Sequence, residues 1–346
     1  AYLSRKQDEF AAKLLKLIPE ATIHWRYEAV LNGMAITIPA NQIDALALMP
    51  EVVEVVPVVP LQLTSARPEV GGLSRGRPIG LGRALLLDTS NDLMGAEELW
   101  NAPGIGGIDR AGLGIKIGII DTGVDFSNPM FQDPSLTPPP GFPRGNTSEQ
   151  LANSKVIVAK VFQSILDKAS GVDPRHKTAQ DLIGHGSHTA SCAAGARVDL
   201  GGTAGARPVV ISGVAPKAFI GSYRVVAPSG GFDALIAGID EAVKDGMDVI
   251  NISLGMPGNG AGLLLNQLDQ AANRAVTAGV IVCAAAGNGG PPTGENQNAA
   301  GGTIASPGNA SRVLTVGAST NAHQGVQVSA LSELRVDDPL PPPEID

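Results

Sequence analysis

Short apolar segments alternate with amphipathic segments from Leu113 onward, and this alternation is the strongest structural pattern in the chain. Two stretches, Phe232–Val243 and Leu264–Val276, place apolar residues three and four positions apart, which predicts amphipathic helices. Six apolar runs have the length of strands: Ile115–Ile120, Val156–Phe162, Ala218–Val226, Asp248–Ser253, Val280–Ala286 and Val313–Gly317. Apolar strands that alternate with helices favour an α/β fold, with a parallel sheet covered by helices on both faces.

The first 63 residues, called the front unit below, show the pattern of a small α+β domain. The predicted elements are a helix with Phe10, Leu14, Leu17 and Ile18 on its apolar face, strands over Thr22–Val30 and Met34–Ile38 with a hairpin turn at Asn32-Gly33, a short helix over Asn41–Met49 and a last strand over Val52–Val59. This order is that of a ferredoxin-like unit without its first strand. We therefore expect that the chain lacks an N-terminal strand.

Residues 64–112 contain two clusters rich in arginine, glycine and proline, followed by one apolar–polar segment at Leu93–Trp100. This composition predicts an exposed linker that ends in a short helix. The expected organisation is thus a front unit of residues 1–63, a linker of residues 64–112 and an α/β unit of residues 113–346.

The composition narrows the class of protein. Hydrophobic residues make up 43% of the 346 positions, enough for a large core, and the net charge of -8 gives no basic footprint for nucleic acid. No apolar run reaches the ~20 residues that cross a membrane, so no membrane span is predicted. Neither nucleic acid nor a membrane is therefore an expected partner. The two cysteines, Cys192 and Cys283, are expected to be buried thiols rather than a disulfide.

Two motifs of the α/β unit carry acid–base side chains. Asp121 ends an apolar run in Ile-Ile-Asp-Thr-Gly, and a carboxylate beside buried residues needs a partner. His185 lies between two glycines in Gly-His-Gly-Ser-His, where the backbone can pass close to a ligand, and the helix-like segment Thr-Ala-Ser-Cys-Ala-Ala follows. Taken alone, Asp121 fits a helix N-cap or a turn. His185 alone fits a core histidine, or half of a metal pair with His188, although no Glu lies near to complete such a site.

Polar and glycine-rich residues follow two further strands, at Ser253-Leu254-Gly255 and at Gly287-Asn288-Gly289. Ligands of parallel sheets bind beyond the carboxyl ends of the strands, so these residues and Asp121 predict one cleft. The side-chain amide of Asn288 is suited to donate a hydrogen bond to a developing oxyanion. Taken alone, it equally fits an Asn-Gly turn.

In chain order, these motifs resemble those of the subtilisin-like serine proteases, over nearly everything from Leu113 to Thr320. Asp-Thr-Gly-Val-Asp matches the aspartate segment of that family, and Gly-His-Gly-Ser-His is similar to its Gly-His-Gly-Thr-His, with Ser187 in place of threonine. The resemblance implies a subtilisin-like fold and a serine endopeptidase that hydrolyses protein or peptide substrates. It also implies a secreted protein whose chemistry needs no cofactor.

The resemblance implies a role for each site residue. Asp121 would orient the imidazole of His185, and His185 would carry the proton of a serine nucleophile to the leaving amine. Asn288 would stabilise the oxyanion, and Ser253, Leu254 and Gly255 would pair with the substrate backbone and line the specificity pocket.

Two further expectations concern the regions around the site. The front unit resembles an inhibitory propeptide whose tail, Val58–Thr64, would lie in the substrate cleft; the alternative is a small accessory domain. Many relatives bind calcium, and here Asp125 and the Asp167–Asp173 loop offer oxygens without a diagnostic spacing.

The serine of the family pattern is missing. In the family it lies in Gly-Thr-Ser-Met-Ala, beyond the strand that matches Val313–Gly317, and the rest of this chain contains no such segment. Ser306 precedes that strand and is assigned to a loop. We expect an inactive front part of an active protease; the alternative is a serine-less pseudoenzyme or binding protein of the same fold.

A nucleotide-binding α/β protein is a further alternative, because glycines at Gly258–Gly262 follow a predicted strand and precede a predicted helix. The next strand ends in Ala285-Ala286-Gly287, without an acidic residue to bind a ribose. The glycine loop is therefore weak support for a nucleotide site.

Overall fold

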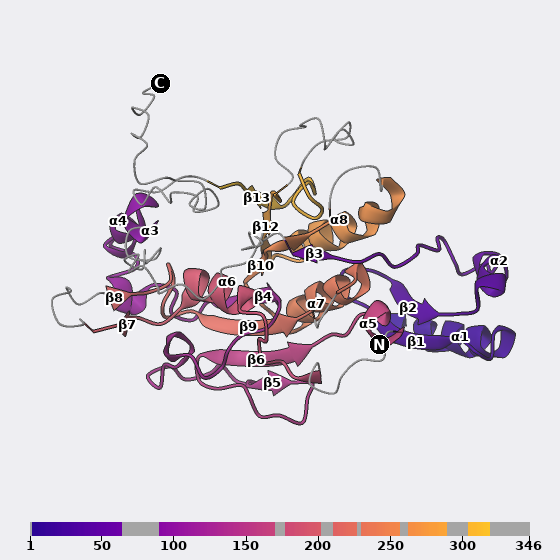
Figure 1. Cartoon of the computed structure of the whole chain (residues 1–346), viewed down its shortest axis with the longest axis horizontal. Helices are drawn as coiled ribbons and strands as arrows, with labels where there is room; N and C mark the ends of the chain where they lie inside the picture. Colours follow the sequence, from indigo (N-terminus) through magenta and orange to yellow (C-terminus); the bar gives the residue numbers. More distant parts are fainter. Residues whose placement is uncertain are drawn as a thin grey trace, which may run out of the picture.

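The computed structural model describes residues 2–63, 90–169, 177–201, 210–226, 230–256, 262–288 and 304–318 (Figure 1). The α/β unit is built on a seven-stranded parallel sheet in the order β13-β12-β10-β4-β9-β6-β5. The strands are β4 (Lys116–Asp121), β5 (Arg144–Gly145), β6 (Val156–Val161), β9 (Phe219–Arg224), β10 (Val249–Ile252), β12 (Ile281–Ala285) and β13 (Leu314–Val316). All six predicted strands are present, with ends shifted by one or two residues; the two-residue β5 was not predicted.

Helices cover both faces of this sheet, as predicted. They are α6 (His185–Ala194), α7 (Phe232–Lys244) and α8 (Gly262–Thr277). Neighbouring residues of β4 point to opposite faces: Ile119 packs in a cluster with Ala190 of α6, whereas Ile120 belongs to the larger cluster that includes Leu235 of α7 and Leu268 of α8. Because β4 is buried on both faces, its sequence is a continuous apolar run that ends in Asp121.

The front unit has its own small core and lies against α7 and α8 (Figure 1). Its elements are α1 (Tyr2–Leu17), β1 (Thr22–Tyr27), β2 (Gly33–Thr37), the 3-10 helix η1 (Ala40–Gln42), α2 (Ile43–Ala47) and β3 (Gln62–Leu63). Leu14 and Ile18 are buried as predicted, but Leu17 is 50% exposed. No helix in the described part of the chain is long and apolar enough to cross a membrane.

Two expectations for the front unit are wrong. The loop between β1 and β2 spans residues 28–32 rather than a tight turn at Asn32-Gly33, because the N–H groups of residues 28, 29 and 30 bond to the carboxylate of Asp240. No strand forms over Val52–Val59, all of which the structure describes. The chain joins a sheet only later, where β3 pairs with β11 (Leu254–Gly255). The sheet of the front unit therefore has two antiparallel strands.

The remaining described elements are short. They are α3 (Ser90–Leu93), α4 (Ala96–Trp100), α5 (Ile165–Ala169), the 3-10 helices η3 (Ile108–Arg110) and η4 (Pro129–Phe131), and the strands β7 (Val198–Asp199) and β8 (Val210–Ile211). The helix predicted over Leu93–Trp100 is divided by Gly95, whose φ of 71° interrupts the helical backbone. The indole N–H of Trp100 donates to the carbonyl of Val214 at 2.7 Å, so this end of the predicted linker packs on the α/β unit. Residues 64–89 of the linker lie outside the described residues.

Candidate active site

Asp121 is the last residue of β4 and is fully buried. One oxygen, Oδ1, accepts hydrogen bonds from the backbone N–H of Thr122 at 2.7 Å and from Nδ1 of His185 at 2.7 Å. The other oxygen, Oδ2, accepts from the hydroxyl of Thr189 at 3.2 Å. With three donors the buried carboxylate is well satisfied. The Asp and His that the sequence analysis selected are therefore in direct contact.

His185 is the first residue of α6, and its side chain is only 14% exposed. The hydrogen bond that the imidazole donates to Asp121 raises the pKa of His185 above its ordinary value; burial opposes this effect, and the charge of Asp121 adds to it. A carboxylate can only accept, so Nδ1 of His185 carries the shared proton. The other ring nitrogen, Nε2, is then the one that can exchange a proton with a reactant.

The glycines of the Gly-His-Gly motif let α6 approach the end of β4. A Cβ on Gly186 would lie 2.1 Å from the carbonyl oxygen of Gly123, so only glycine fits there. The N–H of Gly186 donates to the hydroxyl of Thr122 at 2.8 Å. Gly123 itself has a φ of +104°, in the region that favours glycine. These contacts bring His185 within reach of Asp121.

Asp181 is a site residue that the sequence analysis missed. It lies four residues before His185, and its carboxylate binds both the segment after β4 and the first turn of α6. An Asp just ahead of a predicted helix is a capping signal, and this signal was available in the sequence. Its contact with Thr122 joins distant parts of the chain, and no local signal in the sequence predicts it.

Ser253, Leu254 and Gly255 follow β10, at the same edge of the sheet as Asp121. Leu254 and Gly255 form β11 and pair in antiparallel register with Leu63 and Gln62 of the front unit. The side chain of Asn251 donates to the Ser253 hydroxyl at 3.0 Å. The predicted substrate-binding strand therefore holds an extended segment of the same chain.

Asn288 follows β12 and is exposed at this sheet edge. The residue before it, Gly287, has a φ of +96°, and a Cβ there would lie 2.9 Å from the Cβ of Ala305. Residue 287 therefore has to be glycine for the chain to turn here. The rest of the predicted glycine-rich loop, from residue 289, lies outside the described residues.

Ser306 is fully buried and forms only an isolated bridge with Met256, in agreement with the loop assignment. Its hydroxyl donates to the carboxylate of Asp269 on α8. Burial raises the pKa of that carboxyl, while the hydrogen bond from Ser306 opposes the shift. The Ser306 hydroxyl is thus directed to Asp269 and not to His185.

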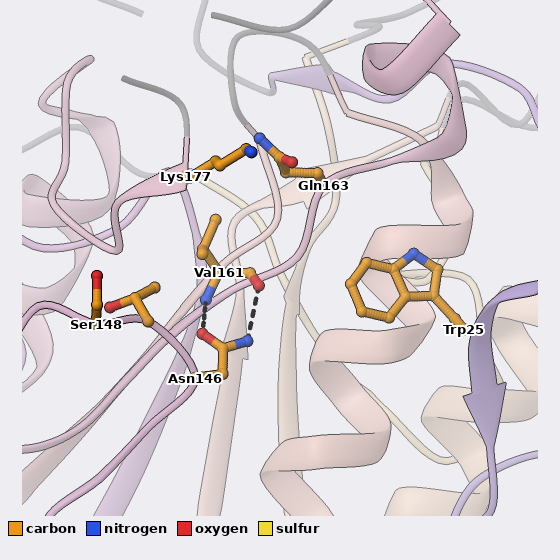
Figure 2. A pocket seen from close by; sticks show the side chains of 7 residues that line it. Trp25, Asn146, Ser148, Val161, Gln163 and Lys177 are labelled. Carbon is orange, nitrogen blue, oxygen red and sulfur yellow. Dashed lines mark hydrogen bonds between the residues drawn. The ribbon is translucent and has the colours of Figure 1, made fainter. Parts of the chain in front are cut away.

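An open cavity of about 330 Å³ lies where the front unit meets the α/β unit (Figure 2). It is lined by Trp25, Asn146, Thr147, Ser148, Val161, Gln163 and Lys177. The ring of Trp25 lies 5.5 Å from that of Phe162, and the amide of Asn146 both donates to and accepts from the backbone of Val161 at 2.9 Å. None of the lining residues belongs to the predicted site.

Asp125, one of the residues considered for calcium, is held by protein donors. Asp125 accepts from the hydroxyl of Ser127 at 2.7 Å and from the amide of Gln180 at 2.8 Å, and these bonds lower the pKa of its carboxyl. The Asp167–Asp173 loop is described only to residue 169. Among the described residues, no group of three His, Cys, Asp or Glu side chains is arranged to hold a metal ion.

Two other expectations from the sequence can be compared with the structure. Cys192 and Cys283 are free thiols as expected, although each is only partly buried. Of the glycine loop considered for a nucleotide, only Gly262, the first residue of α8, lies within the described residues.

The comparisons with known proteins agree on one family. The model of the Subtilase family matches residues 112–338. Subtilisin-like protease SBT2.1 of Arabidopsis thaliana is 34% identical over 292 residues, which are 77% of this chain and 31% of that protein. Minor extracellular protease Vpr of Bacillus subtilis (strain 168) is 28% identical over 328 residues, 88% of this chain and 32% of that protein. The chain spans about a third of the length of the curated relatives it matches.

A solved structure shows the same fold. The crystal structure of the epidermin leader peptide processing serine protease (EpiP) from Staphylococcus aureus matches with a TM-score of 0.52 and 20% identity, over 90% of this chain and 67% of that one. The parallel sheet with α6 on one face and α7 and α8 on the other agrees with this likeness. Because the family model matches well over half of the chain, the protein belongs to the subtilase family.

Proposed function

We propose that this chain carries the proton-transfer pair and the oxyanion donor of a serine endopeptidase. The observation that supports this proposal most directly is the 2.7 Å hydrogen bond between Nδ1 of His185 and Oδ1 of buried Asp121. A histidine held in one tautomer by a carboxylate is the general base of a serine protease triad. The same sheet edge carries the exposed Asn288 and the strand Leu254–Gly255.

In the proposed reaction, Nε2 of His185 takes the proton of a serine hydroxyl as the serine oxygen attacks the peptide carbonyl. The side-chain amide of Asn288 donates to the oxyanion of the tetrahedral intermediate. His185 then gives its proton to the leaving amine as the peptide C–N bond breaks, and an acyl ester remains. Water, deprotonated by His185 in the same way, hydrolyses the ester and restores the serine. Asp121 stabilises the imidazolium in both halves of the reaction.

The proposed reaction needs a serine that these 346 residues do not provide in the family pattern. The sequence contains no Gly-Thr-Ser-Met-Ala segment, and the hydroxyl of Ser306 bonds to Asp269. The proposed nucleophile therefore belongs to a longer protein that includes this chain. We also propose that this longer protein is secreted; a relative, the minor extracellular protease Vpr, supports this by its name.

The tail of the front unit supports a second part of the proposal, that residues 1–63 are an inhibitory propeptide. The N–H of Leu61 donates to the carbonyl of Gly230 at 2.7 Å, and the N–H of Phe232 donates to the carbonyl of Val59 at 3.3 Å. On its other side the tail pairs with Leu254–Gly255 through β3. An extended segment between β11 and the bridge at Gly231 would occupy the place of a substrate backbone, which is how a propeptide tail inhibits its own protease.

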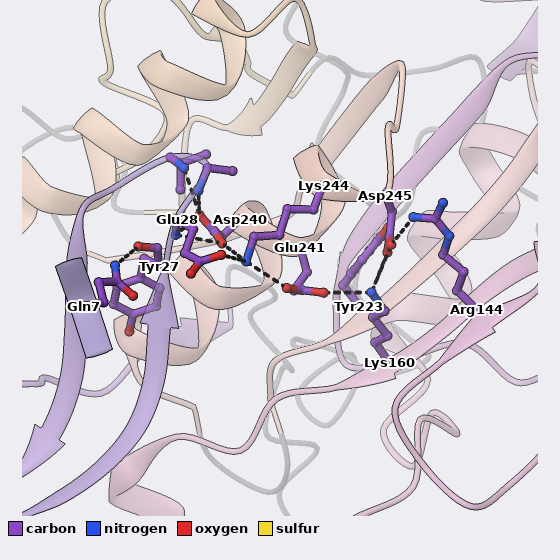
Figure 3. Close-up of polar contacts among 12 residues, drawn as sticks. Gln7, Tyr27, Glu28, Arg144, Lys160, Tyr223, Asp240, Glu241, Lys244 and Asp245 are labelled. Atoms are coloured by element: carbon purple, nitrogen blue, oxygen red, sulfur yellow. Dashed lines mark hydrogen bonds and ion pairs between the residues drawn. The ribbon is translucent and has the colours of Figure 1, made fainter. Parts of the chain in front are cut away.

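The carboxylate of Asp240 on α7 binds the backbone of the front unit. Asp240 is buried, and its Oδ1 accepts from the backbone N–H groups of Ala29 at 2.7 Å and Val30 at 2.8 Å (Figure 3). The guanidinium of Arg274, on α8, donates to the carbonyl of Val30 at 3.1 Å. The hydroxyl of Tyr27 reaches the backbone of Asp233 at 3.0 Å. Docking on these two helices holds the tail in place.

The catalytic part of the proposal is tested with a fluorophosphonate probe, which labels activated serines. The longer protein that includes the proposed serine should be labelled after its front unit is removed, whereas the 346-residue chain should neither be labelled nor cleave casein. Labelling of the 346-residue chain that persists in Ser306→Ala would identify another nucleophile and refute the assignment. Failure of the longer protein to react would refute the endopeptidase proposal.

The docking of the front unit, on which the inhibitory part depends, is tested in this chain by amide hydrogen exchange. Asp240→Ala removes the acceptor of the N–H groups of residues 29 and 30, so these amides should exchange faster by a factor of ten or more if about 1.4 kcal/mol of protection is lost. Asp8→Ala is the control, since Asp8 pairs with Arg26 within the front unit. Unchanged exchange in Asp240→Ala would contradict the proposed anchor.

A further inference from the structure

Asp181 lies beside the Asp121–His185 pair and has no part in the proton transfer described above. It is buried, 9% exposed, and its two oxygens accept five hydrogen bonds. A carboxylate that accepts this many hydrogen bonds fixes the segments that donate them, because a bond to a charged acceptor is stronger than a bond between neutral groups.

One side of Asp181 holds the segment that follows Asp121. The hydroxyl of Thr122 donates to Oδ1 of Asp181 at 2.9 Å and accepts from the N–H of Gly186 at 2.8 Å. The backbone N–H of Asp181 donates to the carbonyl of Val124 at 3.1 Å. Asp181 is thereby fixed to the chain directly after the catalytic aspartate.

The other contacts of Asp181 hold the chain on both sides of His185. Before His185, the N–H groups of Ile183 and Gly184 both donate to Oδ1 at 2.9 Å. After it, the N–H and the hydroxyl of Ser187 donate to Oδ2 at 2.9 and 2.7 Å. The backbone of His185 is therefore held from both sides by one carboxylate.

We propose that Asp181 is the positioning residue of this site, which holds the imidazole of His185 against Asp121; this inference rests on the function proposed above. Asparagine cannot replace it, because the amide NH₂ of Asn would face N–H or O–H donors on one side. The charges that act on His185 among the described residues are those of Asp121 and Asp181. Arg224 is a cation that interacts with the charge of Asp181. Burial lowers the pKa of this guanidinium overall, and the charge of Asp181 opposes that shift.

The test is the NMR titration of the His185 ring in the 346-residue chain, assigned by its loss in His185→Gln. In Asp181→Asn, the titration midpoint of His185 should move to lower pH, and the downfield resonance of the proton on Nδ1 should broaden through faster exchange with water. In the longer protein with its serine, kcat should fall about 10²-fold with little change in KM, the size of effect expected from small displacements of a catalytic group.

Two variants separate positioning from a merely structural role. Asp125, whose backbone N–H donates to the Ser187 hydroxyl at 2.8 Å, is the control. Asp125→Asn removes an equal charge but leaves residues 183 and 184 their acceptor, so it should leave the His185 titration unchanged. Ser187→Ala removes one donor and no charge, and should shift the midpoint in the same direction by less.

A folded Asp181→Asn chain in which His185 titrates as in the unmodified chain would overturn the proposal. If Asp181→Asn fails to fold, an unchanged titration in Ser187→Ala overturns it instead. A failure of the endopeptidase proposal would give a different result. The longer protein would then not be labelled by the fluorophosphonate probe, while Asp181→Asn would still shift the titration of His185.

Discussion

The Asp121–His185 pair and Asn288 lie at the ends of strands of one sheet, yet the protein holds them in different ways. Asp121 is fully buried with three donors, and the backbone on both sides of His185 is bonded to Asp181. Asn288 is exposed, and its place depends on the left-handed backbone at Gly287. The proposed proton-transfer pair is thus fixed by side chains, and the proposed oxyanion donor by a backbone turn.

This difference agrees with the chemistry that each group would perform. Proton transfer needs heavy atoms within about 2.6–3.2 Å and one defined tautomer, so a loose histidine is a poor base. An oxyanion donor must lie about 2.7–3.1 Å from the position where charge develops, and it stabilises the transition state without taking or giving a proton. Mutations in the two regions should therefore differ in both size and kind.

The largest effect is expected from Asp121→Asn, measured in the longer protein that includes the proposed serine. The amide cannot hold the tautomer of His185 that exposes Nε2 to the serine, so kcat should fall by about 10⁴. Asp125→Asn is the matched control and should retain most of the activity. A loss of less than tenfold in Asp121→Asn would show that the 2.7 Å contact with His185 has no catalytic role.

A smaller effect is expected from Asn288→Ala in the same protein. Loss of one oxyanion donor should lower kcat by about 10²–10³ with little change in KM, since the amide acts on the transition state and not on the bound substrate. Because Asn288 is exposed, the thermal unfolding of the Asn288→Ala variant should match that of the unmodified protein. Asn309→Ala, at another exposed asparagine, is the control. A rise in KM at constant kcat would assign Asn288 to substrate binding instead.

The close approach of α6 to β4 can be broken in the 346-residue chain itself. Gly186→Ala places a Cβ 2.1 Å from the carbonyl oxygen of Gly123, and the backbone must move to accept it. The free energy of unfolding should fall by about 1–3 kcal/mol, the usual cost of overpacking, as measured in denaturant. Gly104→Ala meets no atom within 4 Å and should unfold like the unmodified chain. Equal stability of the two variants would contradict the close approach.

The sheet and the pair were predictable because both depend on local sequence. Buried parallel strands are continuous apolar runs, so all six predicted strands were found, and Asp121 could be placed at the end of one. The position of His185 at the start of a helix followed from its flanking glycines and the residues after it. Strand ends carry function in this fold, which made the two motifs meaningful together.

The two wrong expectations for the front unit involve partners far along the chain. Residues 28–30 do not continue the first strand to a tight turn at Asn32-Gly33, because their N–H groups bond to Asp240, more than two hundred residues away. The valines of residues 52–59 looked like a strand, but Val56, Val58 and Val59 pack against the core of the α/β unit. The role of Asp181 likewise depends on Thr122, which only the fold brings near. No local pattern contains these contacts.

The pH dependence of stability is the smallest effect, and it separates the two regions most cleanly. The hydrogen bond that His185 donates to Asp121 raises the pKa of the folded imidazole above its ordinary value of 6.5, whereas the unfolded chain keeps that value. The protonated pair therefore stabilises the folded state fully below about pH 6.5 and loses this contribution as the pH rises through the folded pKa.

The difference in unfolding free energy between the unmodified chain and His185→Gln should thus be greatest in acid and shrink towards alkaline pH, measured by denaturant unfolding from about pH 5 to about pH 9. Asn288→Ala changes no titratable group, so its difference should stay flat over the same range. A His185→Gln difference that is flat, or grows with pH, would contradict the raised pKa. If it shrinks as expected, the same pair that stabilises the fold in acid also keeps His185 protonated up to a higher pH than an ordinary histidine. Only the neutral imidazole can act as a general base, so on acidification the proposed enzyme must lose its base at a pH above the ordinary histidine pKa.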